Sequence, residues 1–369
     1  MKRRYKVLGA MLGLVVVGLA AFAVVLSHDA ACISAQPLAA DAPRMKAIVY
    51  RCYGSPDVLS FEDVAKPTPG DDGVLIKVHV AAVNPLDKHY MHGTPYVVRM
   101  SAGLGAPDDS RMGVDFAGTV EAVGKNVTRF KPGDDVFGGA DGAFAEYVTL
   151  AENRSLALKP AGITFDQAAA VPIAAVTALQ ALRDTGKLKR GQHVLINGAS
   201  GGVGTFAVQI AKSFGAEVTG VCSSRNVELV TSIGADHVVD YTQEDFTKGT
   251  PRYDLIIDTV GNHPLSALSK VMTPTGTLVM VGEAGMGNWV GPFARPLKGW
   301  AMSKFGEQKL AMILAKLNPE DLGILAALMQ AGKMTPVIDR HFPLSDVAEA
   351  IRYLETGRTR GKVVIDIAK

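Results

Sequence analysis

The chain from residue 45 begins with apolar residues spaced as in half-buried strands. Val74, Ile76, Val78 and Val80 share one face of such a run, which is expected to lie against a core. Further strands are predicted over 45–50, 58–64, 114–123 and 143–150, separated by turns rich in Gly, Pro and Asp. This part of the chain is therefore predicted to be a mainly β domain.

From residue 165 the pattern changes to alternating strands and helices. A helix is predicted over 166–184, followed by strands over 194–196, 218–222, 238–240, 255–258 and 277–281, with helical patterns between the strands. This alternation predicts an α/β fold with a doubly wound parallel sheet. Helical patterns follow over 304–317 and 320–331, and the last part reads as strand, helix and strand over 335–342, 346–356 and 362–367.

The N-terminal region is apolar and differs from the rest of the chain. Residues 7–26 carry no charge and follow the basic sequence KRRYK at 2–6. As a helix this run would span about 30 Å, the thickness of a bilayer core. We interpret it as a transmembrane helix that anchors the protein in a membrane by a single pass, followed by a linker over 27–44. A cleaved signal peptide is the alternative, although its apolar region usually has only about 7–15 residues.

One stretch, residues 192–205, joins a short apolar strand to a helix through a turn of small residues. The turn reads Ala199-x-Gly201-x-x-Gly204, the dinucleotide-binding fingerprint with Ala in its first position. Such a turn aims backbone N–H groups and a helix N-terminus at a phosphate, and a Cβ at the glycines would hold a pyrophosphate away. The predicted cofactor contacts are Ala199, Ser200, Gly201, Gly202, Val203 and Gly204.

The residues after the second strand of this unit indicate which dinucleotide is bound. An NAD site usually has Asp or Glu there to bind the ribose 2′-hydroxyl, whereas this chain has Ser223, Ser224 and Arg225. A charge-assisted bond from arginine to a 2′-phosphate contributes roughly 1.5–3 kcal/mol. We therefore predict NADPH. The alternative is that Arg225 is only a solvated residue at the start of the next helix.

Charge and cysteine content exclude several classes of function. The formal net charge is +2, from 38 basic and 36 acidic residues, so no nucleic-acid partner is expected. Cys32, Cys52 and Cys222 lie far apart and outside any CxxC spacing. Because a zinc site needs about three or four clustered ligands, no metal site is predicted. The same scatter argues against a disulfide framework.

Six motifs in a fixed order resemble one family, the medium-chain dehydrogenase/reductases, and within it the zinc-free quinone oxidoreductase-like branch. The motifs are AVNPLD at 82–87, GVDFAGTV at 113–120, GDDVFG at 133–138, AAAVP at 168–172, the glycine turn at 198–204 and GKVV at 361–364. The resemblance implies a GroES-like substrate domain over 45–165, a Rossmann NADP-binding domain over 166–317 and a segment over 318–369 that returns to the first domain. The cofactor would lie in the cleft between the domains, and a homodimer is common in this branch.

The resemblance also implies roles for individual residues. Asn84 and Thr177 would line the nicotinamide end as the catalytic hydrogen-bond donors, and Tyr241 would lie near the 2′-phosphoadenosine. Zinc-dependent relatives have Cys at the position of Asn84 and a His-Glu pair at Val114-Asp115. Because valine cannot bind a metal, we expect chemistry without zinc.

These observations favour an NADPH-dependent reductase that transfers hydride to quinones or α,β-unsaturated carbonyl compounds. A non-catalytic NADPH-binding redox sensor or scaffold is the alternative, because an inherited fold would give the same motifs. A zinc alcohol dehydrogenase is disfavoured. The side of the membrane that holds the catalytic domain stays open, since basic residues before the apolar run favour an inside N-terminus whereas NADPH is normally cytoplasmic.

Overall fold

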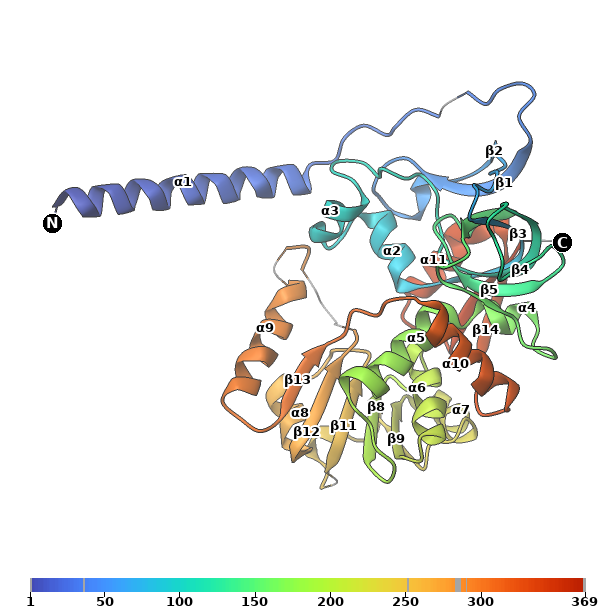
Figure 1. Cartoon of the computed structure of the whole chain (residues 1–369). Coiled ribbons are helices and arrows are strands. Elements are labelled where there is room, and N and C mark those ends of the chain that lie inside the picture. Colours follow the sequence, from blue (N-terminus) through green and yellow to red (C-terminus); the bar gives the residue numbers. More distant parts are fainter. Residues whose placement is uncertain (1, 36, 251, 283–286, 290, 368–369) are drawn as a thin grey trace.

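Two large sheets organise the chain, one above the other in Figure 1. The computed structural model describes residues 2–35, 37–250, 252–282, 287–289 and 291–367. The upper sheet is mainly antiparallel and the lower sheet is parallel, as the change in apolar period near residue 165 predicts.

The upper sheet has seven strands, and two of them come from the end of the chain. The order is β14-β15-β3-β4-β5-β7, with β6 also paired to β3. In the antiparallel pair of β15 and β3, Val363 lies opposite Val83, so the start of β15 meets the end of β3. A separate two-stranded ribbon, β1 (Arg44–Tyr50) and β2 (Leu59–Ala65), precedes the sheet. The seven strands are β3 (Gly73–Val83), β4 (Asp115–Val123), β5 (Asp135–Gly139), β6 (Tyr147–Ala151), β7 (Leu156–Leu158), β14 (Ile338–Pro343) and β15 (Lys362–Asp366).

The lower sheet is parallel throughout and has the strand order β10-β9-β8-β11-β12-β13. The order reverses between β8 and β11, which makes the carboxyl ends of these two strands the point where ligands bind in doubly wound sheets. The six strands are β8 (His193–Asn197), β9 (Glu217–Cys222), β10 (His237–Asp240), β11 (Tyr253–Asp258), β12 (Met272–Met280) and β13 (Lys309–Met312).

Helices cover both faces of the parallel sheet (Figure 1). One face packs against α5 (Pro172–Gln180), α6 (Gly202–Ser213) and α7 (Val227–Ser232), and α10 (Pro319–Gln330) packs on α5. The short helix α4 (Phe165–Ala169) contacts β3, β4 and β5 of the upper sheet. The opposite face packs against α8 (Leu265–Lys270) and α9 (Gly291–Lys304). The upper sheet contacts α11 (Val347–Glu355), while α2 (Pro85–His92) and α3 (Arg99–Ala102) follow β3.

The helix predicted over 304–317 is wrong. Residues Lys309–Met312 form β13, which pairs in parallel with β12. A short apolar run is compatible with either a helix or a strand. Here pairing with β12 stabilises the strand.

The predicted transmembrane helix over 7–26 is also wrong. A helix is present, α1 (Lys2–Ser27), which projects from the rest of the molecule in Figure 1. Within the described part of the chain, however, no helix is both long enough and apolar enough to cross a membrane. The prediction rested on the length of the uncharged run 7–26. The single-pass membrane localisation is therefore wrong as well, and the described helices give no support to a membrane partner.

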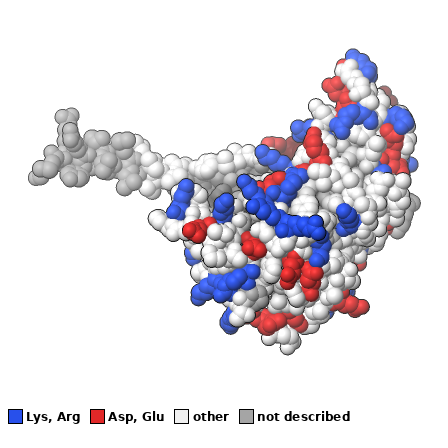
Figure 2. Space-filling model, turned by 60° about the horizontal axis from the view of Figure 1, so that its bottom comes forward, with Lys and Arg blue, Asp and Glu red and all other residues white. Residues whose placement is uncertain are grey.

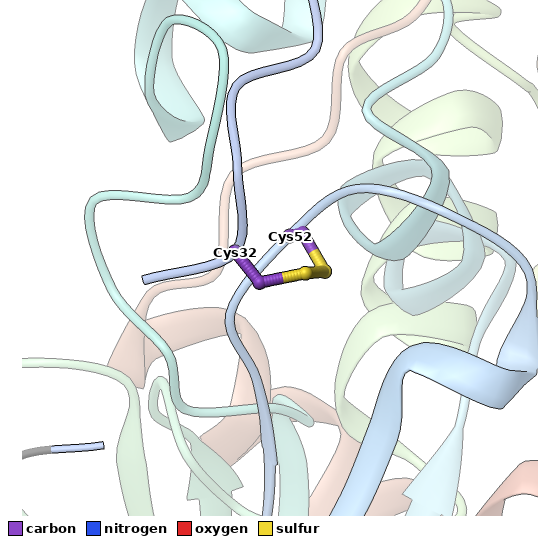
Figure 3. Close-up of a disulfide and its surroundings, with 2 residues drawn as sticks. All are labelled: Cys32 and Cys52. Atoms are coloured by element: carbon purple, nitrogen blue, oxygen red, sulfur yellow. A yellow bond between two sulfur atoms is a disulfide. The ribbon is translucent and has the colours of Figure 1, made fainter. Parts of the chain in front are cut away.

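The end of α1 and the segment after it are attached to the upper domain. Leu26 is buried, and the backbone N–H of Ile33 donates to the carbonyl oxygen of Arg51 at 3.0 Å. This pairing brings Cys32 and Cys52 to a Cα–Cα distance of 4.5 Å, and they form a disulfide (Figure 3). The argument against a disulfide framework did not foresee this bond, because a separation of 20 residues along the chain hides the proximity of the two cysteines in space. Cys222 is a free thiol and is buried.

Charged side chains of both signs share the surface. On the face seen in Figure 2, groups of Lys and Arg alternate with groups of Asp and Glu, as the small net charge suggests.

Candidate active site

The glycine turn lies at the reversal point of the parallel sheet. β8 ends at Asn197, and Gly198 follows with φ 84°, a conformation that favours glycine. The backbone N–H of Gly198 and of Ala199 both donate to Val221 O, which ties the turn to β9. Gly201 is the N-cap of α6, so the first N–H groups of this helix have no intrahelical acceptor and face the turn.

Close packing between this turn and α6 requires glycine at position 204. A Cβ on Gly204 would lie 2.1 Å from Gly198 O and 2.8 Å from the Cα of Ala199. The absence of a side chain lets the helix N-terminus approach the turn, as a bound pyrophosphate needs. The predicted residues Ala199, Ser200, Gly201, Gly202, Val203 and Gly204 therefore lie together in one turn at the start of α6.

A second group lies where β9 ends. The side-chain amide of Asn226 donates to the hydroxyl of Ser200 at 2.9 Å and to that of Ser223 at 3.3 Å. Asn226 is buried, and its Oδ1 has no hydrogen-bond partner among the described residues. A buried acceptor without a donor is costly, and a ribose hydroxyl would satisfy it. The residues at this end of the turn therefore fit a dinucleotide.

Ser224, Arg225 and Tyr241 lie nearby with different partners. The hydroxyl of Ser224 donates to Asp240 Oδ2 at 2.5 Å, and the guanidinium of Arg225 donates to Arg358 O at 2.7 Å. Tyr241 is exposed, and its backbone N–H donates to Cys222 O. Ser224 is thus engaged by a carboxylate, whereas Arg225 stands exposed beside the end of β9.

Asn84 belongs to a buried charged cluster that joins three distant segments. Lys362 Nζ donates to Asn84 Oδ1 at 2.5 Å and to Val83 O at 3.1 Å, and it lies 3.4 Å from Asp115 Oδ2. The other carboxylate oxygen of Asp115 accepts from Ile173 N at 3.0 Å. Burial raises the pKa of Asp115, and the neighbouring Lys362 opposes the rise. Because an ammonium can only donate, it forces the oxygen of the Asn84 amide toward itself.

Asp87 braces the backbone at Asn84 from the first turn of α2. Its Oδ2 accepts from Asn84 N at 2.7 Å. Burial raises the pKa of Asp87 to about 7, while the hydrogen bond from the Asn84 backbone opposes the rise. The side chain therefore supports the segment that holds Asn84.

Thr177 lies on α5, one turn after Ile173. Its hydroxyl donates to Ile173 O at 2.7 Å, so its proton is used inside the helix and its lone pairs remain as acceptors. Ile173 N binds Asp115, which connects Thr177 to the Asn84 cluster through one carboxylate.

Comparison with known proteins gives the family. Residues 70–161 match the alcohol dehydrogenase GroES-like domain, and residues 233–365 match the family described as zinc-binding dehydrogenase. The 2-methylene-furan-3-one reductase of Solanum lycopersicum is 37% identical, over 87% of this chain and 79% of that protein. The chain belongs to the medium-chain dehydrogenase/reductase family. It is also 35% identical to the chloroplastic NADPH-dependent alkenal/one oxidoreductase of Arabidopsis thaliana, with the same two coverages.

A solved structure supports the quinone oxidoreductase-like branch of the medium-chain dehydrogenase/reductases. The quinone oxidoreductase of Coxiella burnetii superposes with a TM-score of 0.78 at 32% identity, covering 88% of this chain and 100% of that one.

The residues of this medium-chain dehydrogenase/reductase do not fit a zinc ion at the positions of the zinc-dependent relatives. The ammonium of Lys362 contacts both Asn84 and Asp115 there, and Val114 offers no ligand atom. A second cation beside a buried ammonium would be repelled. Elsewhere in the described chain, Asp166, His341 and Asp366 each offer a possible ligand atom, and these atoms lie within 4.8 Å of one another. None of the three is a predicted site residue.

Sequence reasoning missed four residues that shape this medium-chain dehydrogenase/reductase site. Lys362 and Asp115 were noticed only as parts of motifs, and Asn226 was not singled out. A lysine inside the apolar strand 362–366 was the available signal, because a buried lysine needs a partner. Asp240 gave no signal, since only strand pairing brings it to Ser224.

Proposed function

We propose that this chain is an NADPH-dependent reductase that transfers hydride to quinones or α,β-unsaturated carbonyl compounds without zinc. The observation that carries the proposal is the buried contact of Lys362 with Asn84 and Asp115. This contact holds the polar amide of Asn84 at the predicted nicotinamide end of the cleft, at a position where zinc-dependent relatives have a metal ligand. The relative named NADPH-dependent alkenal/one oxidoreductase supports the same cofactor and substrate class.

In this proposal NADPH, when bound, supplies the hydride, and the chain binds the cofactor and orients the acceptor. The turn 199–204 and the N-terminus of α6 would hold the pyrophosphate. Ser223 and Arg225 would take the 2′-phosphate, with Ser224 and Tyr241 beside it, and Asn226 would accept a ribose hydroxyl. The substrate domain over 45–165, the NADP-binding domain over 166–317 and the returning segment over 318–369 are the divisions that we propose.

Charge develops on the oxygen of a quinone or enone during hydride transfer, and a fixed donor stabilises it. Lys362 holds Asn84 Oδ1, which leaves Asn84 Nδ2 as the donating end of the amide. Nδ2 donates to Ala82 O at 3.3 Å, and the Asn84 side chain also hydrogen-bonds the carboxylate of Asp115. We infer that this amide donates to the substrate oxygen or to the nicotinamide carboxamide, with Thr177 as the neighbouring acceptor.

The test is NADPH oxidation by the purified full chain with a panel of quinones and enones, run beside NADH. Arg225→Ala should lower the preference for NADPH over NADH by about 10- to 100-fold, because a charge-assisted bond to the 2′-phosphate is lost. Arg44→Ala, which changes an exposed arginine in β1, should leave the preference unchanged. Tight NADPH binding without turnover of any acceptor would instead favour a non-catalytic NADPH-binding protein.

A homodimer is a further part of the proposal. β13 is the last strand of its sheet, and Met312 and Leu314 beside it are exposed. A second copy could cover this edge. Light scattering coupled to size-exclusion chromatography measures the mass, and a monomer at all concentrations would exclude it.

A further inference from the structure

The segment Leu26–Ile33, which we call the N-terminal strap, lies against the loop 93–106. The backbone N–H of Ala30 donates to Gly105 O at 2.9 Å, and the disulfide fixes Cys32 to Cys52 (Figure 3). The loop 93–106 follows α2, the helix that begins beside Asn84. The strap precedes both regions that match the family descriptions, so this contact is a feature of this chain's own N-terminal part.

Arg99 makes the main polar contact between the loop and the strap. Its side chain is only 2% exposed, and its Nη1 donates to Leu26 O and His28 O, both at 3.1 Å. Its Nη2 donates to Asp29 Oδ1 at 2.7 Å, and its Nε donates to Gly93 O at 2.9 Å. Three of these four acceptors come from the strap.

The guanidinium of Arg99 also stacks on two aromatic rings. Its Cζ lies 4.5 Å from the centre of the Tyr53 ring and 4.8 Å from that of Tyr96. Both rings therefore contribute cation–π attraction and shield the guanidinium from water. Tyr96 is thus held in place by the same side chain that contacts the strap.

Tyr96 continues the contact to the other domain. Its ring centre lies 4.6 Å from that of Trp289, edge to face, and its N–H donates to Asn288 O at 2.9 Å. Asn288 and Trp289 belong to the stretch between β12 and α9, which starts near the carboxyl ends of the parallel strands. The strap, Arg99, Tyr96 and Trp289 therefore form one continuous chain of contacts. It links the loop after α2, the helix capped by Asn84, to the stretch that follows the carboxyl end of β12.

This arrangement depends on the strap, because a buried charge that loses its acceptors is strongly unfavourable. If the strap moved away, Arg99 would keep only Gly93 O and would turn toward water. Tyr96 would then lose one face of its packing, and its contact with Trp289 would loosen.

We propose that Arg99 is a positioning residue that holds Tyr96 against Trp289 and so sets substrate selectivity, and that the disulfide-bonded strap keeps Arg99 in place. The selectivity part rests on the proposed reductase function. The strap thus contributes to the substrate pocket without touching the substrate.

The experiment uses the full chain with Trp300→Phe, because Trp289 is then the remaining tryptophan of the two. Acrylamide quenching of Trp289 is measured without substrate in three variants: Arg99→Met, Asp29→Asn, and Cys32→Ser combined with Cys52→Ser. Arg352→Met is the matched control, since Arg352 pairs with the exposed residues Asp57 and Glu349. We expect the quenching constant to rise about twofold for Arg99→Met and for the double serine variant, less for Asp29→Asn, and not for the control.

Steady-state kinetics with a small and a bulky enone test selectivity. Loosening the pocket should raise KM for the small enone roughly tenfold while kcat stays within about twofold, so the preference for the small enone falls. A variant that only loses stability would show a lower melting temperature with an unchanged preference. Asp29→Asn keeps the test valid if Arg99→Met does not fold, because it removes only the charge of an exposed carboxylate that pairs with Arg99.

The outcomes separate this inference from the proposed function. Unchanged quenching of Trp289 in folded Arg99→Met and in the double serine variant would overturn the inference. Increased quenching with an unchanged preference would overturn its selectivity part. Increased quenching in a chain that reduces no acceptor would support the contact chain while refuting the reductase function.

Discussion

Lys362 shows how one buried charge can decide the chemistry of a site. Its side chain is 3% exposed, and its ammonium contacts Asn84 Oδ1, Val83 O and Asp115. A side chain that only donates fixes which end of an amide faces it. The orientation of the Asn84 amide therefore depends on Lys362, which no sequence motif links to Asn84.

Replacing this ammonium tests its role. Lys362→Met should lower kcat/KM by about 100-fold, because the Asn84 amide is free to rotate, and should cost about 3–5 kcal/mol of stability by leaving Asp115 unpaired. Adding Asp115→Asn should restore much of the stability but not the activity. Urea unfolding and steady-state kinetics measure both, with the exposed Lys125→Met as the control. Full activity in folded Lys362→Met would contradict the assigned role.

The buried Asp87 predicts a pH dependence of stability. Its pKa is about 7 in the folded chain against 3.8 as the ordinary value, so the folded state binds the proton more tightly than the unfolded state. Stability from this group is fully present below about pH 4 and is lost as the pH rises through about 7, up to about 4 kcal/mol.

Asp87→Asn removes this titration. The difference in free energy of unfolding between the two proteins should therefore change between about pH 4 and about pH 8, with the natural chain losing more. Urea unfolding across this range measures it. Parallel curves for the two proteins would show that Asp87 is ionised when folded.

At the scale of elements, the turn between β8 and α6 was predictable because its requirements are local. Gly198 is needed for its backbone conformation and Gly204 for the close approach of α6 to the turn. Both glycines can be read directly from the sequence. The partners of Ser224 and Asn84 were not predictable, because Asp240 and Lys362 reach them through strand pairing. The same reason explains β13, where a neighbouring strand overrides a helical pattern.

The fit of α6 against this turn gives a direct prediction. Gly204→Ala should weaken NADPH binding by at least about tenfold and lower the melting temperature, because the new Cβ meets backbone atoms that must shift. Gly323→Ala in α10 is the matched control, since the Cβ that alanine adds there would have nothing within 4 Å. This substitution should be neutral or stabilising. Titration of NADPH fluorescence and thermal unfolding measure the two effects.

At the scale of the whole molecule, the disulfide joins the N-terminal strap to the upper domain. Closing a loop of 20 residues in the unfolded chain stabilises the folded state by about 3 kcal/mol in the chain-entropy estimate. Replacing Cys32 and Cys52 by Ser should remove about this much.

Urea unfolding of the double serine variant and of the reduced natural chain checks this prediction. The two should agree with each other, while Cys222→Ser should not reproduce the loss, because Cys222 is not bonded. Equal stability of the oxidised and reduced chains would show that the strap is already ordered without the bond.

The junction of β15 with β3 has a consequence for how the protein acquires activity. Lys362 and Asn84 are 278 positions apart, so the polypeptide must close one of its longest loops before these groups meet. Such distant contacts form late during folding. A nascent chain that has not yet released residue 362 from the ribosome could already assemble the nucleotide turn, yet it would bind cofactor without the lysine that orients the amide. Catalytic competence should therefore appear after, and separately from, dinucleotide affinity.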